Sequence, residues 1–249
     1  MASYTGTSGH DIITGSTGPD YIRGYNGDDQ LFGLDGFDTI YGNTGKDRLV
    51  GGAGDDNLHG GAGGDDVMEG GTGDDYYQVE TPGDRVVELD GEGVDMVDAF
   101  GDIILANHVE VLRMRGGTHA IGNDSANRIY TFSDNSRILE GRGGDDQLFA
   151  SILFTDTLLG GDGDDFLQGS GDDLLDGGAG NDTLFKGGED AGADILGGEG
   201  NDLLMVGDGS NGRFVGDVGD DSYVLQKPLS GATIIEHGAV EVAASDFVL

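Results

Sequence analysis

The sequence has no cysteine and no tryptophan, only 3 prolines and only 12 lysine and arginine residues in 249. The lack of cysteine excludes disulfides and thiolate metal sites as sources of stability. Aromatic residues make up 7% and hydrophobic residues 36%, which is little material for an ordinary core. No apolar run approaches the roughly 18 residues of a membrane span. Stability must therefore come from something other than a thick core or covalent links.

Acidic residues and glycine are abundant instead. The chain has 48 aspartates and glutamates, a formal net charge of −36, and 51 glycines. A polyanion of this kind repels nucleic acid and anionic membrane surfaces and attracts cations. We therefore expect no nucleic-acid partner and no membrane span. Composition alone also fits a disordered acidic chain, so the choice depends on periodicity.

A nine-residue phrase repeats from residue 6 to 78. It begins GTSGHDIIT, GSTGPDYIR and GYNGDDQLF and is interrupted once, by Gly60. The eighth position is a large apolar residue in all eight phrases, from Ile13 to Tyr77. The sixth position is always aspartate: Asp11, Asp20, Asp29, Asp38, Asp47, Asp56, Asp66 and Asp75. Such regularity argues against disorder in this half once a suitable ion is bound.

A second, less regular array runs from residue 141 to 224. Its clean phrases, such as GGDGDDFLQ, carry aspartate at the sixth position: Asp146, Asp165, Asp182, Asp202 and Asp221. Degenerate phrases between them offer their nearest equivalents: Asp156, Asp173 and Asp194. In GDGSNGRFV the position is Gly212, where we expect a gap in the row of ligands.

These aspartates are predicted to bind Ca²⁺. Calcium takes about six to eight oxygen ligands from carboxylates and backbone carbonyls in flexible geometry. Each phrase supplies one carboxylate, and its glycines permit positive φ and let carbonyl groups turn inward. A tight turn with a local aspartate acceptor, or a solvated acidic residue, accounts for a single phrase. Neither accounts for eight consecutive phrases at identical spacing.

The pattern G-G-x-G-x-D-x-U-x, with U a large apolar residue, resembles the hemolysin-type calcium-binding nonapeptide of RTX (repeats-in-toxin) proteins. The resemblance implies an all-β fold, a parallel β-roll or β-solenoid in which two phrases make one coil. It implies GGxGxD turns, short xUx strands, and calcium ions between the turns of phrases n and n+2, on the order of ten in all. The expected domains are a β-roll block at 6–78, a strand-rich connector at 79–140 that continues the solenoid, a second block at 141–224, and a C-terminal cap at 225–249.

Folding is expected to depend on calcium. Strand alternation places only position eight inside, so the core is thin, and the carboxylates repel one another until a cation neutralises them. We therefore predict an expanded metal-free chain and a calcium-bound roll. Extracellular modules bind calcium with a Kd of about 10⁻⁴–10⁻³ M, which cytosolic calcium does not fill. The coupling thus indicates a protein that works outside the cell.

The two ends bear on export. The start, MASYTGTSGHDIITG, lacks the charged and apolar segments of a cleaved secretory peptide. The last four residues, Asp246 to Leu249, resemble the extreme C-terminal signal of RTX proteins exported by bacterial type I secretion systems. We expect a secreted, extracellular bacterial protein with type I secretion machinery as a partner. The alternative for the last four residues is an edge strand or cap.

The connector and the tail lack clean phrases. Alternating apolar residues predict strands at 86–89, 94–97 and 109–114. Asn127 stands where aspartate belongs, so that phrase is expected to keep the coil without the ion. The tail alternates like a strand and is expected to cap the open end of the roll.

Residues that bind a partner are expected among the side chains that face outward from the strands. Alternate phrases of the first block expose polar and aromatic side chains, predicted to lie about 4.8 Å apart: Tyr21, Arg23, Thr39, Tyr41, Asn57, His59, Tyr76 and Gln78. This row resembles the binding role of RTX modules attached to alginate-modifying enzymes, while the alternative is an ordinary solvated face. The second block presents an apolar stripe, expected to be covered by the connector, the tail or a second copy: Phe149, Phe166, Phe185, Leu203 and Met205.

No catalytic pattern is present. The 5 histidines are scattered without an HExxH pair, and no GxSxG elbow occurs. We therefore predict a non-enzymatic calcium-binding protein with an extracellular structural, polysaccharide-binding or surface-binding role. The alternative is a non-catalytic binding or export module related to a larger RTX enzyme, such as an alginate-modifying enzyme or a protease. A membrane-active secreted protein is a third class, disfavoured by the missing apolar segment.

Overall fold

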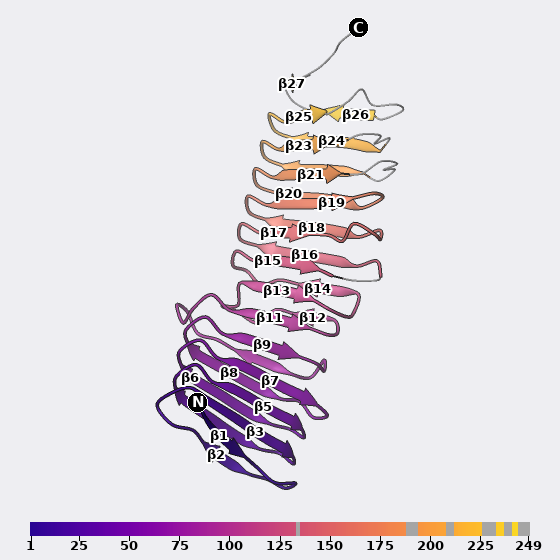
Figure 1. Ribbon diagram of the computed structural model, residues 1–249. Helices are drawn as coiled ribbons and strands as arrows, with labels where there is room; N and C mark the ends of the chain where they lie inside the picture. Colours follow the sequence, from indigo (N-terminus) through magenta and orange to yellow (C-terminus); the bar gives the residue numbers. More distant parts are fainter. Residues whose placement is uncertain (133–134, 188–193, 208–211, 226–232, 237–240, 244–249) are drawn as a thin grey trace. The chain divides into compact units, whose positions relative to one another are not determined.

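The computed structural model describes residues 1–132, 135–187, 194–207, 212–225, 233–236 and 241–243 (Figure 1). In this described part every regular element is a β-strand, and it contains no helix that could span a membrane. The protein is an all-β parallel β-solenoid of about 12 turns, as the repeats predict. Contacts divide it into two compact units, Met1–Gly117 and Thr118–Leu249.

Unit 1 contains two parallel sheets to which successive strands contribute alternately. The first sheet has the order β1 (Ala2–Thr5), β3 (Asp20–Asn26), β5 (Thr39–Thr44), β7 (Asn57–Ala62), β9 (Tyr76–Val79), β11 (Met96–Ala99) and β13 (Val111–Met114). The second has the order β10 (Arg85–Val87), β8 (Val67–Thr72), β6 (Arg48–Ala53), β4 (Gln30–Asp35) and β2 (Ile12–Thr14). A short strand, β12 (Ile103–Ile104), also lies in this unit.

Unit 2 repeats the same plan. One row of strands is β15 (Arg128–Thr131), β17 (Gln147–Phe149), β19 (Phe166–Ser170), β21 (Thr183–Gly187), β23 (Leu203–Val206), β25 (Ser222–Leu225) and β27 (Glu241–Ala243). The other is β14 (His119–Ile121), β16 (Ile138–Gly143), β18 (Thr157–Asp162), β20 (Leu174–Ala179), β22 (Ile195–Glu199), β24 (Arg213–Val218) and β26 (Thr233–Glu236).

The strand register places each phrase beside the phrase two further along. Ile22 pairs with Ile40, and Ile40 pairs with Leu58, all at the eighth position. The expected two-phrase coil is therefore confirmed. The strands are longer than the predicted xUx: β5 begins at the seventh position of one phrase and ends at the third position of the next. The parallel pairing thus includes glycines that were expected to lie only in turns.

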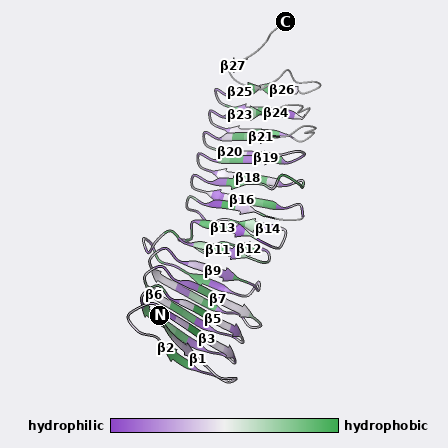
Figure 2. Cartoon of the chain, viewed as in Figure 1, coloured by the Kyte–Doolittle hydropathy of each residue, from purple (hydrophilic) through white to green (hydrophobic). Residues whose placement is uncertain are grey.

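The eighth-position side chains form most of the core, as strand alternation predicts. Figure 2 shows hydrophobic residues concentrated on the strands. Flanking residues at positions seven and nine are half-buried on the outer faces. The eighth-position residues with no exposed surface include Ile22, Leu31, Ile40, Leu49, Leu58, Met68, Tyr77, Leu139, Leu148, Leu158, Leu167, Leu175, Leu184, Ile195, Leu204, Phe214 and Tyr223.

Close contact between neighbouring turns explains the glycine at the fourth position. Gly45 has φ of 138°, a conformation that side chains disfavour. A Cβ atom at Gly45 would also overlap the carbonyl oxygen of Gly27 in the preceding coil. Glycine is therefore needed here both for its backbone conformation and for its lack of a side chain.

The connector strands differ in detail from the prediction. Strands form at 85–87, 96–99 and 111–114, against the predicted 86–89, 94–97 and 109–114. The second begins two residues late because Asp95 occupies the sixth position, so the strand starts at Met96. The strands β12 and β14 were not predicted. The division between the units falls after Gly117, inside the proposed connector, and the proposed domain limits stay a prediction.

In the tail, β26 pairs with β24 and β27 pairs with β25, both in parallel. The capping role of residues 225–249 stays a prediction. The four terminal residues of the expected secretion signal lie outside the described residues.

Candidate metal centres

The sixth-position aspartates form stacked chains of hydrogen bonds, here called the inner ladders. In each step, the backbone amide of one aspartate donates to Oδ1 of the aspartate two phrases later. In unit 1 the amide of Asp20 donates to Asp38 at 2.7 Å, and that of Asp29 donates to Asp47 at 2.8 Å. In unit 2 the amide of Asp146 donates to Asp165 at 2.8 Å. The structure thus brings together the aspartates of phrases n and n+2.

The second carboxylate oxygen, Oδ2, is the unusual feature of this arrangement. It is buried and has no hydrogen-bond partner in twelve aspartates of the described residues: Asp29, Asp38, Asp47, Asp56, Asp66, Asp75, Asp95, Asp146, Asp165, Asp182, Asp202 and Asp221. A buried ionised oxygen without a partner is costly, so each of these atoms calls for a cation or a proton.

Backbone carbonyls reach the same places. A Cβ atom at Gly42 would overlap both Oδ2 of Asp47 and the carbonyl oxygen of Gly60. Carboxylate and carbonyl oxygens thus both lie beside the first-position glycine of a phrase. This all-oxygen donor set is the type that calcium prefers. The residues present therefore fit a calcium ion, and a larger residue in place of the glycine would fill the space.

Burial shifts the ionisation of these carboxyl groups. It raises the pKa of Asp47 to about 6, of Asp56 to about 7 and of Asp75 to about 8. The backbone hydrogen bonds to these carboxylates act in the opposite direction and lower the pKa, but by less. In unit 2 it raises the pKa of Asp146 to about 7 and of Asp182 to about 6. Without a cation, many of these groups hold a proton near neutral pH.

In four of the predicted ligands Oδ2 is not left without a partner, because a group in the same turn donates a hydrogen bond to it. Oδ2 of Asp11 accepts from Thr7, and Oδ2 of Asp20 accepts from the amide and hydroxyl of Ser16. Burial acts to raise the pKa of Asp20, but the hydrogen bonds from Ser16 and Ala2 and the charge of the N-terminus together outweigh it and lower that pKa. The same kind of turn occurs where Ser151 donates to Asp156 and Ser170 to Asp173.

Asp194 does not lie in an inner ladder. Ile195 pairs with Leu175, which is at the eighth position, so Asp194 occupies the outward seventh position. Its carboxylate accepts bonds from the amide and the guanidinium of Arg213, at 3.1 and 3.3 Å. The sequence-based assignment of Asp194 as an equivalent of the sixth position is therefore wrong. The irregular phrase GGEDAGADIL shifts the register by one residue.

The same edge of unit 2 buries two basic side chains. Arg137 stands at the sixth position, is 3% exposed, and its amide donates to Asp156 Oδ1 at 2.8 Å. Lys186 replaces the first-position glycine and has no exposed surface. Burial lowers the pKa of Lys186, while Asp173, Asp172 and Asp194 act to raise it. Two basic side chains of the protein are therefore buried beside the carboxylates of this edge.

Asn127 keeps the coil, as predicted. Its backbone amide donates to Asp146 Oδ1 at 2.7 Å, and its side-chain Oδ1 accepts a hydrogen bond from the backbone amide of Asn123 at 2.8 Å. The ladder geometry thus survives the loss of one carboxylate charge. Gly212 is described, but residues 208–211 of its phrase lie outside the described residues.

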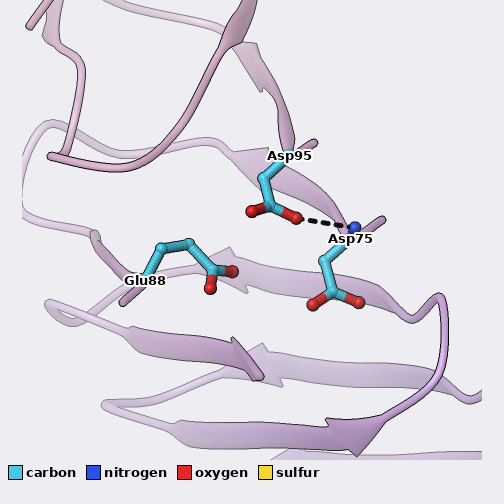
Figure 3. Close-up of side chains that lie close together, drawn as sticks. All are labelled: Asp75, Glu88 and Asp95. Carbon is cyan, nitrogen blue, oxygen red and sulfur yellow. Dashed lines mark hydrogen bonds between the residues drawn. The ribbon is translucent and has the colours of Figure 1, made fainter. Parts of the chain in front are cut away.

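Three acidic residues that the sequence analysis missed extend the ladders of unit 1. Asp84 accepts from Asp66 at 3.2 Å, Asp95 accepts from Asp75 at 2.8 Å, and Glu110 accepts from Asp95 at 2.8 Å. The stretch GEGVDMV holds glycine, aspartate and valine at the fourth, sixth and eighth positions, a signal that identifies Asp95. A fourth missed residue, Glu88, lies with Asp75 and Asp95 in Figure 3 and follows no repeat rule.

A second ladder, here called the outer ladder, runs along the exposed fifth position. Its bonds have the opposite direction: the amide of Asp74 donates to Asp55 at 2.9 Å, and that of Asp164 donates to Asp145 at 3.0 Å. Asn181 and Asn201 take this place in unit 2 and accept equally well, at 3.0 and 2.8 Å. In the outer ladder an asparagine amide oxygen therefore accepts the bond as well as a carboxylate oxygen does.

The outward residues of unit 1 form a row of rings. Ring centroids are 5.6 Å apart for Tyr21 and Tyr41, 4.4 Å for Tyr41 and His59, and 5.8 Å for His59 and Tyr76. The guanidinium of Arg23 lies 4.9 Å from the Tyr21 ring centroid. A hollow of about 300 Å³ adjoins the row, lined by Tyr41, Asn43, Thr44, His59, Gln78 and Glu80 among others.

The predicted apolar stripe of unit 2 is present as a row of half-buried side chains. Tyr130 stacks on Phe149 with centroids 4.9 Å apart, and Phe149 lies 5.8 Å from Phe166. Ile152 and Leu153 nearby in the sequence are exposed, at 83% and 74%. What covers this stripe stays a prediction.

A family model described as the RTX calcium-binding nonapeptide repeat matches residues 5–40, 32–65, 41–77, 153–184 and 190–212, just over half of the chain. The comparison identified these repeats and no catalytic domain. A search among curated proteins found no match.

Proposed function

The chain belongs to the RTX calcium-binding nonapeptide repeat family, and we propose that it is secreted and folds when it binds calcium outside the cell. The observation that carries this proposal is that, in the part of the chain that the structure describes, twelve buried aspartate oxygens have no hydrogen-bond partner. One buried side chain per phrase does little to offset the cost of ordering nine residues and burying a charge. A cation that neutralises the ladders makes the folded state favourable.

The chain's own groups divide the work of binding. The N–H···Oδ1 bond between successive aspartates holds each carboxylate in a fixed orientation and directs Oδ2 toward the first-position glycine. The glycine leaves room there, and a carbonyl oxygen from the next coil lies close enough to serve as a second oxygen ligand for a cation. Calcium, when bound, supplies the positive charge that these oxygens lack.

Export before folding agrees with this chemistry. Sites of the extracellular type have a Kd of about 10⁻⁴–10⁻³ M, so the chain stays unfolded in a cytosol poor in calcium and folds once outside. Repeats of this family are typical of bacterial proteins secreted by type I systems, which supports an extracellular location.

For the extracellular role, we propose binding to a polysaccharide or a cell-surface component through the ring row of unit 1. Tyr41 and His59 stack face to face, so ring edges, hydroxyl groups and imidazole nitrogens are the groups available for contact. Burial lowers the pKa of His59, which favours a neutral imidazole that accepts or donates hydrogen bonds. Amides of Asn43 and Gln78 line the adjoining hollow. A polymer with repeated hydroxyl groups suits such a row.

Circular dichroism tests the folding proposal. We expect a β-sheet spectrum in millimolar calcium, loss of that spectrum in EGTA, and recovery when calcium is restored. Magnesium at the same concentration should not substitute, because it demands a tighter octahedral geometry. A β-sheet spectrum that is unchanged by EGTA at neutral pH would contradict the proposal.

Glycan-array and alginate binding, each measured with and without calcium, test the proposed partner. We expect calcium-dependent binding that the Tyr41→Ala variant weakens. Val50→Ala on the second sheet is the matched control, because Val50 is also half-buried at an outward ninth position. Absence of binding to any glycan, in a protein that folds with calcium, would favour a purely structural role.

A further inference from the structure

Glu88 is a glutamate where earlier coils have glycine. Strand β10 pairs with β8 so that Val87 faces Glu69. Glu88 therefore follows Val87 as Gly70 follows Glu69, at the first position of a phrase. In the regular coils this position adjoins the aspartate Oδ2, and a Cβ at Gly70 would overlap Oδ2 of Asp75 and the hydroxyl of Tyr77. Glu88 thus places a third carboxylate where the repeats leave space.

Three buried carboxylates meet at this point (Figure 3). One oxygen from each of Asp75, Glu88 and Asp95 lies within 4.8 Å of the other two. If the three oxygens formed an equilateral triangle with sides of 4.8 Å, its centre would lie about 2.8 Å from each oxygen. This distance is only slightly longer than a calcium–oxygen bond, which is roughly 2.3–2.6 Å. The exposed fractions of these residues are 2%, 6% and 1%.

The hydrogen bonds around the cluster leave one oxygen of each residue unsatisfied. The amide of Asp75 donates to Oδ1 of Asp95 at 2.8 Å, and the hydroxyl of Tyr77 donates to Oε1 of Glu88. Oδ2 of Asp75, Oδ2 of Asp95 and Oε2 of Glu88 are buried without a hydrogen-bond partner. Among the described ion pairs, none links a basic side chain to these three residues.

We propose that Asp75, Glu88 and Asp95 form a distinct site for a calcium-class cation. It deepens the proposed function and rests on it, because Asp75 and Asp95 are successive members of an inner ladder. Its third carboxylate comes from a residue that the nonapeptide does not contain. The flexible, all-oxygen donor set suits calcium or a lanthanide rather than magnesium.

The added charge sets this site apart from the others. Elsewhere in the inner ladders, a cation between two phrases meets the carboxylates of two aspartates, whereas here it meets three carboxylates. Because the number of charged ligands tunes calcium affinity, this site is the tightest among those of the described residues and fills first. It lies where the regular phrases of unit 1 end, between β9, β10 and β11.

Terbium luminescence tests the proposal on the full chain. Tb³⁺ replaces calcium at oxygen sites, and the phenol of Tyr77, bonded to Glu88, is placed to sensitise an ion bound there. We expect a high-affinity luminescence phase that Tyr77→Phe abolishes, that calcium displaces and that magnesium does not. Glu88→Gln, which keeps the size and removes the charge, should weaken this phase by about tenfold or more. The matched control is Glu69→Gln, on the neighbouring strand and paired with Arg48 at the surface.

A second variant guards against misfolding. Glu88→Gly restores the glycine of the repeat, so we expect it to fold with calcium while also losing the high-affinity phase. An unchanged high-affinity phase in both Glu88→Gln and Glu88→Gly would overturn the site. If the high-affinity phase is unchanged in both variants but folding still depends on calcium, the site is wrong and the proposed function stands. If the chain folds equally well without calcium, only the proposed function is contradicted.

Discussion

The backbone amide of Asp38 donates a 2.7 Å hydrogen bond to Oδ1 of Asp56, which lies 18 residues later and one coil further along the solenoid. This bond uses one carboxylate oxygen to connect the coils and leaves Oδ2 buried and without a partner. The same group therefore supports the backbone with one oxygen and leaves the other for a cation or a proton. We therefore expect folding and ion binding to be linked at the steps of the ladder where Oδ2 has no partner.

Replacing Asp56 by asparagine should separate these two tasks. The Asp56→Asn side chain would keep an acceptor for the amide of Asp38 but lose the charge, so we expect the calcium concentration at half-folding to rise several-fold. Asp55→Asn is the matched control in the same turn, since Asn181 and Asn201 already serve in the outer ladder. Calcium titrations followed by circular dichroism measure both. Equal effects of the two substitutions would argue against calcium at the inner ladder.

Gly42→Ala should destabilise the calcium-bound roll by about 1–3 kcal/mol, because the added methyl group overlaps Oδ2 of Asp47 and the Gly60 carbonyl. Gly18→Ala is the control, since a Cβ atom there meets nothing within 4 Å. Thermal unfolding in saturating calcium compares the two variants with the parent chain. A Gly42→Ala variant as stable and as tight for calcium as Gly18→Ala would mean that the space beside Gly42 is not used.

The stability of the metal-free roll should fall as pH rises. Burial raises the pKa of Asp47 to about 6, of Asp56 to about 7 and of Asp75 to about 8, above the ordinary aspartate value of 3.8. The folded state therefore holds more protons than the unfolded chain. This contribution to stability is complete below about pH 4 and is lost as pH rises through about 6 to 8. Far-UV circular dichroism in EGTA, from about pH 5 to about pH 8.5, should show structure decreasing across that window.

Calcium should reverse this dependence. Binding needs ionised carboxylates, so the apparent affinity should increase as pH rises through about 6 to 8. Calcium titrations at several pH values measure the effect. A metal-free chain that gains structure with rising pH would contradict the assignment of buried, protonated carboxyl groups.

Leu58→Ala should cost about 2–5 kcal/mol in the calcium-bound state, because Leu58 has no exposed surface and its removal leaves a cavity in a thin core. Val50→Ala, at a half-buried outward position, should cost less than about 1 kcal/mol. Denaturant unfolding in saturating calcium provides the comparison. Similar losses in both variants would show that the eighth position is not the main apolar support.

Much of the roll follows from the sequence because the repeat is short and regular. Once Asp20 and Asp38 are known to occupy the same position in alternate phrases, a two-phrase coil places them side by side. Strand alternation then buries Ile22 and Ile40 and leaves Tyr21 outside. The prediction failed where the spacing changed, as at Asp194, because a one-residue shift turns a side chain to the other face.

What the sequence determined by itself is the periodic part: parallel coils, an apolar eighth position and a carboxylate at the sixth. Only the tertiary structure decided how the irregular residues join that pattern. Glu88 lies 13 residues after Asp75 and 7 before Asp95, with no repeat to relate them, yet the three carboxylates converge. The physical reason is that strand pairing between neighbouring coils sets these distances, and such pairing can be inferred from spacing only while the spacing is constant.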